Sequence, residues 1–346
     1  MSGVSGVSGL PAPRPVAEYE GVDRARFEAE IRPLGQPAVL RGLARDWPAV
    51  QAAVRSDEEF IDYVRRFRLT HSVTILVGDP AIKGRFFYAD DMRSLNFGSG
   101  KSPIDPFLDR LLRDRDKAEP FAIALQSTPV PDLLPGFERE NATVLLDPSV
   151  VPRMWMGNAA RVAAHYDLKE NIGCVVAGRR RFTLYPPEQI GNLYPGPLEL
   201  TPAGTPVSVV DPQAPDLERY PRFAEAAAAA QSAELRPGDA IYIPYLWWHA
   251  VDSLEPVNLF INYWWNPARQ DLGSPYDALM FGMFALRALP EDQRAAWRAV
   301  FDHYVFETNG DPAAHIPEGA RGALGAMTPE QLARMRATLR QILRGI

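Results

Sequence analysis

The chain has 346 residues, of which 46% are hydrophobic and 23% are charged, and its formal net charge is -6. This composition is ordinary for a globular protein, and the length allows one large domain or one domain with an appendage. The negative charge argues against general binding of nucleic acid, which needs a basic face to meet the phosphates.

The sequence shows no signal for a membrane segment or for a multi-cysteine metal cluster. The N-terminal stretch MSGVSGVSGLPAPRP lacks the basic region and the continuous apolar core of a signal peptide. No apolar run approaches the roughly 18 uncharged residues that a spanning helix needs. The one cysteine, Cys174, lies in the apolar context GCVVAG, which indicates a buried structural thiol. We therefore expect a cytoplasmic protein without membrane contact.

Short helices and strands are predicted to alternate in the N-terminal third of the chain. Apolar spacing at three to four residues indicates the helices, and short apolar runs indicate the strands. The predicted elements are a disordered Gly-, Ser- and Pro-rich leader at 1–18, helices at 23–32 and 57–67, strands at PAVLRGL and HSVTILVG, and loops at 90–120 with a short helix at 107–112.

The middle of the chain consists mainly of short β-rich runs separated by Gly, Pro and Asp turn signals. That pattern predicts an antiparallel sandwich or barrel. One interruption, from about 200 to 234, predicts a Pro-rich loop that leads into an Ala-rich helix. The β-rich runs are PRMWMGN, NIGCVVAG, RRFTLYPP, DAIYIPY, WHAVDSL and NLFINYWW.

The pattern becomes helical after Pro267. The stretch TPEQ, from Thr328 to Gln331, fits a capping box with proline at the first helical position. An apolar stripe at helical spacing follows it. Its members are Leu332, Met335, Leu339, Ile342 and Leu343.

His165 and Asp167 lie two residues apart at the start of the β-rich region. Side chains two apart in an extended strand point to the same face, so these two can reach one point. His249 lies in another β-rich run, PGDAIYIPYLWWHAVDSL. Two histidines and one carboxylate on one face of a barrel leave open positions on an octahedral metal, which is the arrangement of non-haem Fe(II) oxygenases.

Each part of this set has an ordinary structural explanation when it is taken alone. Many loops contain a His-x-Asp triplet by chance. A histidine after two tryptophans is more often packed and hydrogen-bonded than a metal ligand. The three residues together, in this order and within a predicted all-β region, favour the metal site.

Several longer motifs follow one another in the order seen in a known family. They are PAVLRGLARDWPAV, AAHYD, AGRRRFTLYPPEQIGNLYPGP, ERYPRF, RPGDAIYIPYLWWHAV and NLFINYWW. Together they resemble the JmjC-type, cupin-like oxygenases that depend on Fe(II) and 2-oxoglutarate, and in particular the branch with the asparaginyl hydroxylase that inhibits hypoxia-inducible factor. The resemblance implies a mainly β fold with flanking helices, a double-stranded β-helix or jelly-roll barrel, at 19–267. A C-terminal helical segment would occupy 268–346.

The resemblance also implies the roles of the site residues. His165, Asp167 and His249 would bind Fe(II), with 2-oxoglutarate and O₂ as co-substrates. Family members usually hold the far carboxylate of 2-oxoglutarate with a lysine fifteen residues after the first histidine, where this chain has Arg180. An arginine offers a bidentate fork to a carboxylate but needs more room than a lysine.

The run of three arginines around Arg180 could also be a solvated hairpin tip. Strand alternation places Arg180 on the face of Phe182 and Leu184, opposite Arg179 and Arg181. We therefore expect Arg180 to point into the barrel.

Further polar and aromatic side chains are candidates for contact with the co-substrate. Asn171 and Asn262 match asparagines near the co-substrate of the hypoxia-factor hydroxylase, although hydrogen bonding at strand ends is the simpler explanation for both. Trp264 shares alternation with Asn262 and could form a wall of the pocket.

Two contacts of the hypoxia-factor hydroxylase are missing. The threonine three residues before the first histidine is Val162 here, and no tyrosine stands beside Gln126. Asn158 and Arg161 are candidates to replace these contacts, although Arg161 could equally form a surface salt bridge.

The first functional hypothesis is an oxygenase that hydroxylates a protein side chain or a small molecule, with a substrate pocket built by loops at 80–120 and 195–235. Asp167 argues against a halogenase, in which that carboxylate is replaced to make room for halide. The alternative is a non-catalytic metal-binding cupin that binds a ligand or a partner, which Arg180 and Val162 favour. A third hypothesis is a cupin isomerase that uses Zn or Mn. The apolar stripe of the tail, with the resemblance, predicts a homodimer through the C-terminal helices.

Overall fold

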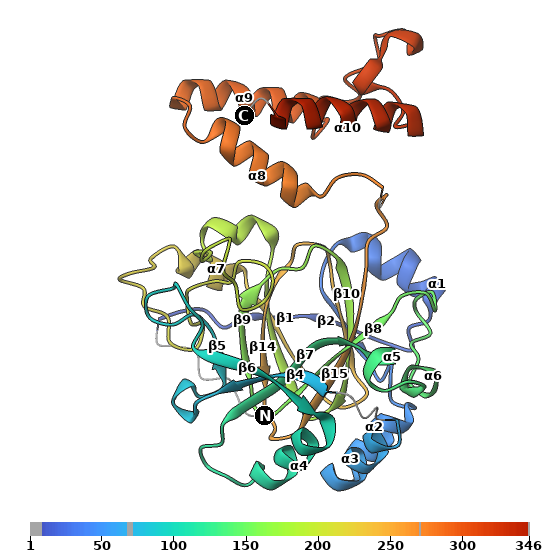
Figure 1. Cartoon of the computed structure of the whole chain (residues 1–346), viewed down its shortest axis with the longest axis vertical. Helices are drawn as coiled ribbons and strands as arrows, with labels where there is room; N and C mark the ends of the chain where they lie inside the picture. The colour runs from blue at the N-terminus through green and yellow to red at the C-terminus, as the bar shows by residue number, and fades with distance from the viewer. Residues whose placement is uncertain (1–8, 68–71, 270, 345–346) are drawn as a thin grey trace. The chain divides into compact units, whose positions relative to one another are not determined.

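A computed structural model describes residues 9–67, 72–269 and 271–344. Internal contacts divide the chain into two compact units, with the boundary between Asn266 and Pro267. The first unit is built on two β-sheets and the second is helical (Figure 1). None of the described helices is both long and apolar enough to cross a membrane.

Most strand pairs in both sheets of the first unit are antiparallel, and in the described chain the parallel pairs involve only short strands at sheet edges. The six-stranded sheet has the order β1 (Arg14–Pro15), β12 (Gln231–Leu235), β11 (Arg180–Tyr185), β14 (Trp248–Ser253), β9 (Arg161–His165) and β5 (Arg85–Phe86). The nine-stranded sheet has the order β2 (Ala17–Glu20), β3 (Ala38–Arg41), β13 (Ala240–Ile243), β10 (Glu170–Ala177), β15 (Asn258–Trp265), β8 (Pro152–Gly157), β7 (Ala122–Pro129), β4 (Ser72–Gly78) and β6 (Phe97–Pro103).

Helices cover the sheets of the first unit and make up most of the second. In the first unit they are α1 (Arg24–Arg26), α2 (Pro48–Arg55), α3 (Asp57–Arg65), α4 (Ile104–Asp114), α5 (Val130–Leu133), α6 (Phe137–Glu140) and α7 (Phe223–Ala229). In the second unit they are α8 (Pro275–Leu286), α9 (Glu291–Tyr304) and α10 (Pro329–Arg344). The predicted cap of α10 is confirmed, because Oγ1 of Thr328 accepts a hydrogen bond from the backbone N of Gln331 at 3.2 Å.

The two largest apolar clusters of the described residues lie in the first unit. One core packs helices α2, α3 and α4 against the nine-stranded sheet, through residues such as Phe60 and Leu108. The other fills the space between the sheets, where the rings of Phe182 and Phe260 lie 5.7 Å apart. The predicted barrel of two sheets is thus confirmed.

The structure corrects several predicted elements. Strands β1 and β2 begin inside the predicted leader, whose first eight residues lie outside the described chain. Strand β6 occupies part of the predicted loop at 90–120, and β12 part of the interruption at 200–234. The predicted helix at 23–32 is α1 followed by a π-helical turn at Phe27–Ile31. The partners of β1 and β6 lie elsewhere in the chain, so local pattern does not reveal these strands.

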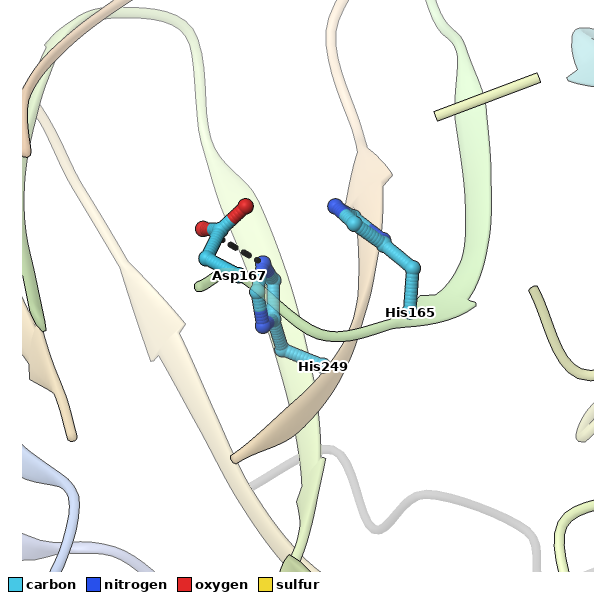
Figure 2. Close-up of side chains that lie close together, drawn as sticks. All are labelled: His165, Asp167 and His249. Carbon is cyan, nitrogen blue, oxygen red and sulfur yellow. Dashed lines mark ion pairs between the residues drawn. The ribbon is translucent and has the colours of Figure 1, made fainter. Parts of the chain in front are cut away.

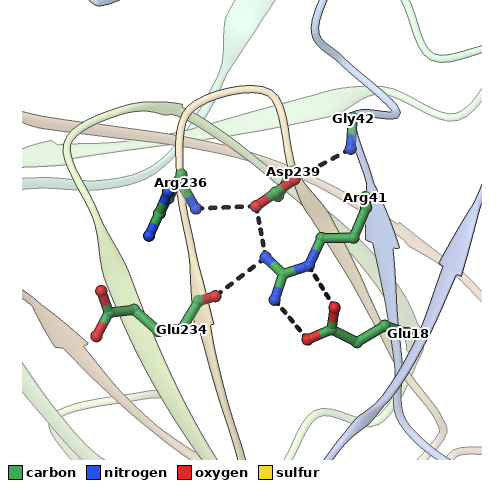
Figure 3. A network of polar contacts seen from close by, with 6 residues as sticks. All are labelled: Glu18, Arg41, Gly42, Glu234, Arg236 and Asp239. Carbon is green, nitrogen blue, oxygen red and sulfur yellow. Dashed lines mark hydrogen bonds and ion pairs between the residues drawn. The ribbon is translucent and has the colours of Figure 1, made fainter. Parts of the chain in front are cut away.

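An ion-pair network joins the N-terminal strands to the turn between β12 and β13 (Figure 3). The Asp239 carboxylate, in a residue only 9% exposed, accepts hydrogen bonds from Nη1 of Arg41 at 2.6 Å and from the backbone N atoms of Gly42 at 3.0 Å and Arg236 at 3.1 Å. Arg41 also donates two hydrogen bonds to the Glu18 carboxylate, at 2.9 and 2.6 Å. These bonds, those with Glu18 first, raise the pKa of Arg41 above its usual value.

We predict that Asp239→Ala lowers the free energy of unfolding by about 2–3 kcal/mol, because it leaves the backbone amides of Gly42 and Arg236 without their acceptor and removes one of the two carboxylates that pair with Arg41. The control is Arg179→Ala, which removes an exposed pair with Glu234 and Glu255 and should cost less than about 1 kcal/mol. Urea unfolding followed by circular dichroism measures both. Equal losses in the two variants would contradict a special role for Asp239.

Candidate metal centre

His165 and His249 face each other across adjacent antiparallel strands. His165 ends β9 and is the direct partner of His249 in β14, with ring centroids 4.3 Å apart. Asp167 lies just beyond the end of β9, and its Oδ2 is 3.7 Å from Nε2 of His249. Ligand atoms of the three residues all lie within 4.8 Å of one another (Figure 2). The predicted convergence of these side chains is confirmed.

A β-bulge in β9 changes the direction in which the side chains of this strand point. His249 of β14 opposes His165 of β9, and Val251 of β14 opposes Val162 of β9. Between these two pairs β9 has one residue more than β14. Val162 and His165 are three residues apart and would point to opposite faces of a regular strand, yet both line one cavity. Bulges re-aim side chains in this way and are common beside functional sites.

Each imidazole is oriented by a backbone carbonyl of its own strand region. Nδ1 of His165 lies 3.0 Å from the carbonyl O of Ala163, and Nδ1 of His249 lies 3.0 Å from that of Trp247. A carbonyl only accepts, so each Nδ1 carries a proton, and a ring with no second proton keeps a lone pair on Nε2. Burial, and then the nearby His249, lower the pKa of His165 to about 4, which keeps this ring neutral at neutral pH. Neutral imidazole is the form that ligates metals.

The predicted residues Asn171, Asn262 and Trp264 all reach the site. They line the same cavity as the two histidines and Asp167. Nε1 of Trp264 donates to Oδ2 of Asp167 at 3.0 Å, and Nδ2 of Asn171 donates to the same oxygen at 3.2 Å. Their contact with a co-substrate stays a prediction.

Arg180 points into this cavity, whose volume is about 480 Å³, as alternation predicted. The residue is 7% exposed, its guanidinium lies 5.0 Å from the ring centroid of Phe260, and Nη2 is 3.4 Å from the carbonyl O of Trp155. Within the described chain its Nε has no hydrogen-bond partner and no carboxylate pairs with it. Burial lowers the pKa of Arg180 to about 9, so the group stays charged at neutral pH.

The neighbouring arginines lie on the outer face of the sheet. Arg179 pairs with Glu234 and Glu255, and Arg181 lies 3.5 Å from Glu234. Arg180 is therefore the member of the run that a ligand in the cavity can reach. The predicted burial of Cys174 is also confirmed, because the residue is fully buried, and this burial raises the pKa of its thiol to about 12.

The structure contradicts the predictions for Asn158 and Arg161, neither of which lines the cavity. Asn158 uses its amide to bind backbone, accepting from N of Ile123 at 3.0 Å and donating to O of Phe121 at 2.8 Å. Arg161 lies 2.6 Å from Asp211 on the outer face. In a regular strand Arg161 would share the face of His165, but the extra residue in β9 reverses its direction.

Several residues that line the cavity were not predicted. Trp155 points inward from β8, and strand alternation with the buried Met154 and Met156 could have revealed it. Gln126 and Ser127 reach the cavity at a second bulge, in β7, where Ser127 has φ 49°. Phe86 and the segment 202–204 come from the loops expected to build the substrate pocket.

Comparison with known proteins places this site in a family. The family model of the cupin-like domain matches residues 24–271. The chain is 29% identical to lysine-specific demethylase JMJ31 of Arabidopsis thaliana, over 70% of this chain and 48% of that protein. It is 28% identical to human bifunctional peptidase and (3S)-lysyl hydroxylase JMJD7, over 67% of this chain and 77% of that protein.

A further relative is tRNA wybutosine-synthesizing protein 5 of Gallus gallus, at 26% identity over 72% of this chain and 76% of that protein. The chain spans about half the length of the plant relative. The region matched by the family model contains both sheets from β3 onward and all three convergent residues. The chain belongs to the cupin-like domain family.

Proposed function

We propose that this protein is an oxygenase that uses Fe(II), 2-oxoglutarate and O₂ to hydroxylate a protein side chain or a small molecule. The proposal rests on one observation. His165, Asp167 and His249 line the same cavity as the guanidinium of Arg180, which pairs with no carboxylate in the described chain. Two relatives, one named as a lysyl hydroxylase and one as a lysine-specific demethylase, support it.

The donor set fits a divalent iron. Two neutral imidazole nitrogens and one carboxylate form the facial triad of non-haem Fe(II) oxygenases, which leaves positions open for other ligands. Iron bound there would supply the redox chemistry that lets O₂ oxidise a C–H bond. In the overall reaction, one oxygen atom enters the substrate and the other enters succinate, while 2-oxoglutarate loses CO₂.

The charges of the cavity fit a dicarboxylate. A divalent ion held by Asp167 leaves one net positive charge, and Arg180 adds a second, so the two charges of 2-oxoglutarate would be balanced. Nε and the Nη atoms of Arg180 can hold the far carboxylate as a bidentate pair. The low dielectric of the buried site strengthens that interaction, and Phe182 and Phe260 exclude water beside it.

A non-catalytic metal-binding cupin is the competing function. Val162 lines the cavity and offers no hydroxyl where the hypoxia-factor hydroxylase has a threonine, which favours a module that has lost turnover. The closer likeness to the branch of the hypoxia-factor hydroxylase and a cytoplasmic location stay predictions.

We predict that the protein, loaded anaerobically with Fe(II) and then exposed to air with 2-oxoglutarate and ascorbate, forms succinate that proton NMR detects. With no substrate present, ascorbate supplies the two electrons that reduce the second oxygen atom to water. His165→Ala should abolish the reaction because it removes a metal ligand. His303→Ala, in α9 of the second unit, is the matched control and should keep the activity. Neither succinate nor 2-oxoglutarate binding in the unmodified protein would favour the binding module instead.

We predict that Arg180→Met raises the dissociation constant for 2-oxoglutarate at least about 30-fold, because truncating one partner of a buried charge pair costs about 2–5 kcal/mol. Arg180→Lys should recover part of the affinity, since it restores the charge without the planar fork. Arg181→Met, one residue away on the outer face, should change little. Titration calorimetry with Mn(II) in place of iron measures all three. A comparable loss for Arg181→Met would contradict the assignment.

We propose that the protein is a homodimer through its C-terminal helices. The stripe on α10 keeps large apolar side chains in water, with Leu339 52%, Ile342 45% and Leu343 60% exposed. We predict that Leu339→Arg halves the mass measured by light scattering, whereas Gln341→Arg, on the opposite side of α10, does not. A monomeric mass for the unmodified protein, or an unchanged mass for Leu339→Arg, would contradict the proposal.

A further inference from the structure

Side chains from the nine-stranded sheet hold the carboxylate of Asp167, which itself follows β9 of the six-stranded sheet. Both donors to its Oδ2, Trp264 in β15 and Asn171 in β10, are direct partners in that opposite sheet. Among the described residues, Oδ1 of Asp167 receives no hydrogen bond. The two oxygens of this carboxylate are therefore inequivalent.

A second amide and a second indole hold Asn171 in turn. Nδ2 of Asn262 donates to Oδ1 of Asn171 at 3.2 Å, and Nε1 of Trp155 donates to Oδ1 of Asn262 at 2.8 Å. Asn171 is 4% exposed and Asn262 1% exposed, so water does not compete for these groups. The rings of Trp155 and Trp264 pack edge to face, with centroids 5.9 Å apart.

The chemistry of its two ends fixes the direction of this hydrogen-bonded chain. An indole N–H can only donate and an ionised carboxylate can only accept. Asn262 must therefore turn its oxygen to Trp155 and its nitrogen to Asn171, and Asn171 must turn its nitrogen to Asp167. A flipped amide at either position would place oxygen against oxygen in a buried site, which costs about 1–3 kcal/mol for each unsatisfied group.

We propose that Trp155, Asn262, Asn171 and Trp264 form a positioning relay that occupies Oδ2 of Asp167 and leaves Oδ1 as its metal-binding oxygen. The proposal rests on the metal site of the proposed function. A carboxylate oxygen offers about two lone-pair sites, and the two donors use both on Oδ2. Coordination through Oδ1 alone takes one position on the metal instead of two. The relay thereby keeps a further position open for co-substrates.

The four members are positioning residues, and conservative variants separate this role from packing. Trp264→Phe keeps an aromatic ring and removes the donor to Asp167. Trp155→Phe does the same at the far end of the relay, away from the metal ligands. Trp265→Phe is the matched control, because Trp265 stacks on Tyr242 from the other face of β15 and, in the described chain, makes no bond to Asp167.

The test measures Co(II) binding to the metal-free full-length protein by calorimetry, together with the visible spectrum of the Co(II) complex. We expect Trp264→Phe to weaken binding about 10- to 100-fold, as loss of outer-shell partners does in other metal sites. Trp155→Phe should weaken it in the same direction but less, and Trp265→Phe should not. The Co(II) bands should shift in the first two variants only, since each variant weakens the hold on Oδ2 and lets the carboxylate change its orientation at the metal ion.

The outcomes separate this proposal from the proposed function. Normal Co(II) affinity in both relay variants would overturn the relay and leave the metal site standing. Weaker binding with an unchanged Co(II) spectrum would show a merely structural role and would also overturn it. Failure of the unmodified protein to bind Co(II) would overturn both the relay and the metal site.

Discussion

The pairing of β9 with β14 determines where every group of the site lies. Because His249 opposes His165 directly, one cavity receives both rings, and a slip of one residue would turn His249 to the outer face of the sheet. The pairing of β11 with β14 sets the distance between the histidines and Arg180. Leu184 of β11 opposes His249, and Arg180 lies four residues before Leu184 in the same strand. At about 3.3 Å per residue this is about 13 Å, a separation that a long side chain and a five-carbon diacid can fill together.

The two sheets contribute different chemistry to the cavity. The six-stranded sheet supplies the histidines and the guanidinium, whereas the nine-stranded sheet supplies the amides and indoles. The hydrogen bonds to Asp167 cross from one sheet to the other, so the geometry of the carboxylate depends on how the sheets pack. The contact of Phe182 with Phe260, and the position of Arg180 over that ring, connect the same packing to the cationic end of the cavity.

Regular strands explain how much of the site could be predicted from the sequence. Alternation placed Arg180 correctly because β11 pairs without interruption with both of its neighbours. It failed for Arg161 because one extra residue in β9 turns that side chain outward and brings Val162 in. Ser127, at the bulge of β7, escaped notice for the same reason. The position of a bulge depends on how a strand pairs with its partner strand, so the local sequence does not reveal it.

The same limit applies to the fold. The central strands are apolar enough to be predicted from their own sequence. Strand β1 has only two residues, and it is a strand because it pairs in parallel with β12, more than two hundred residues later. Asn158 looked like a site residue because a buried polar side chain is unusual. One accepted bond from the backbone of β7 and one donated bond to the residue before β7 give both ends of the amide a partner, and no sequence pattern shows such partners.

Arg180 and Val162 are two departures from the family pattern that have a joint physical explanation. In the pattern that the resemblance implies, a lysine supplies the charge for the far carboxylate, and in the hypoxia-factor hydroxylase a threonine hydroxyl also contacts the co-substrate. An arginine supplies the charge and a planar pair of donors from one side chain. The hydroxyl would then be dispensable. An apolar Val162 lines the same cavity as the buried guanidinium, which pairs with no carboxylate in the described chain, and lowers the local dielectric in which the bond to a carboxylate would act. The two departures therefore compensate each other, which favours a site that still binds a dicarboxylate.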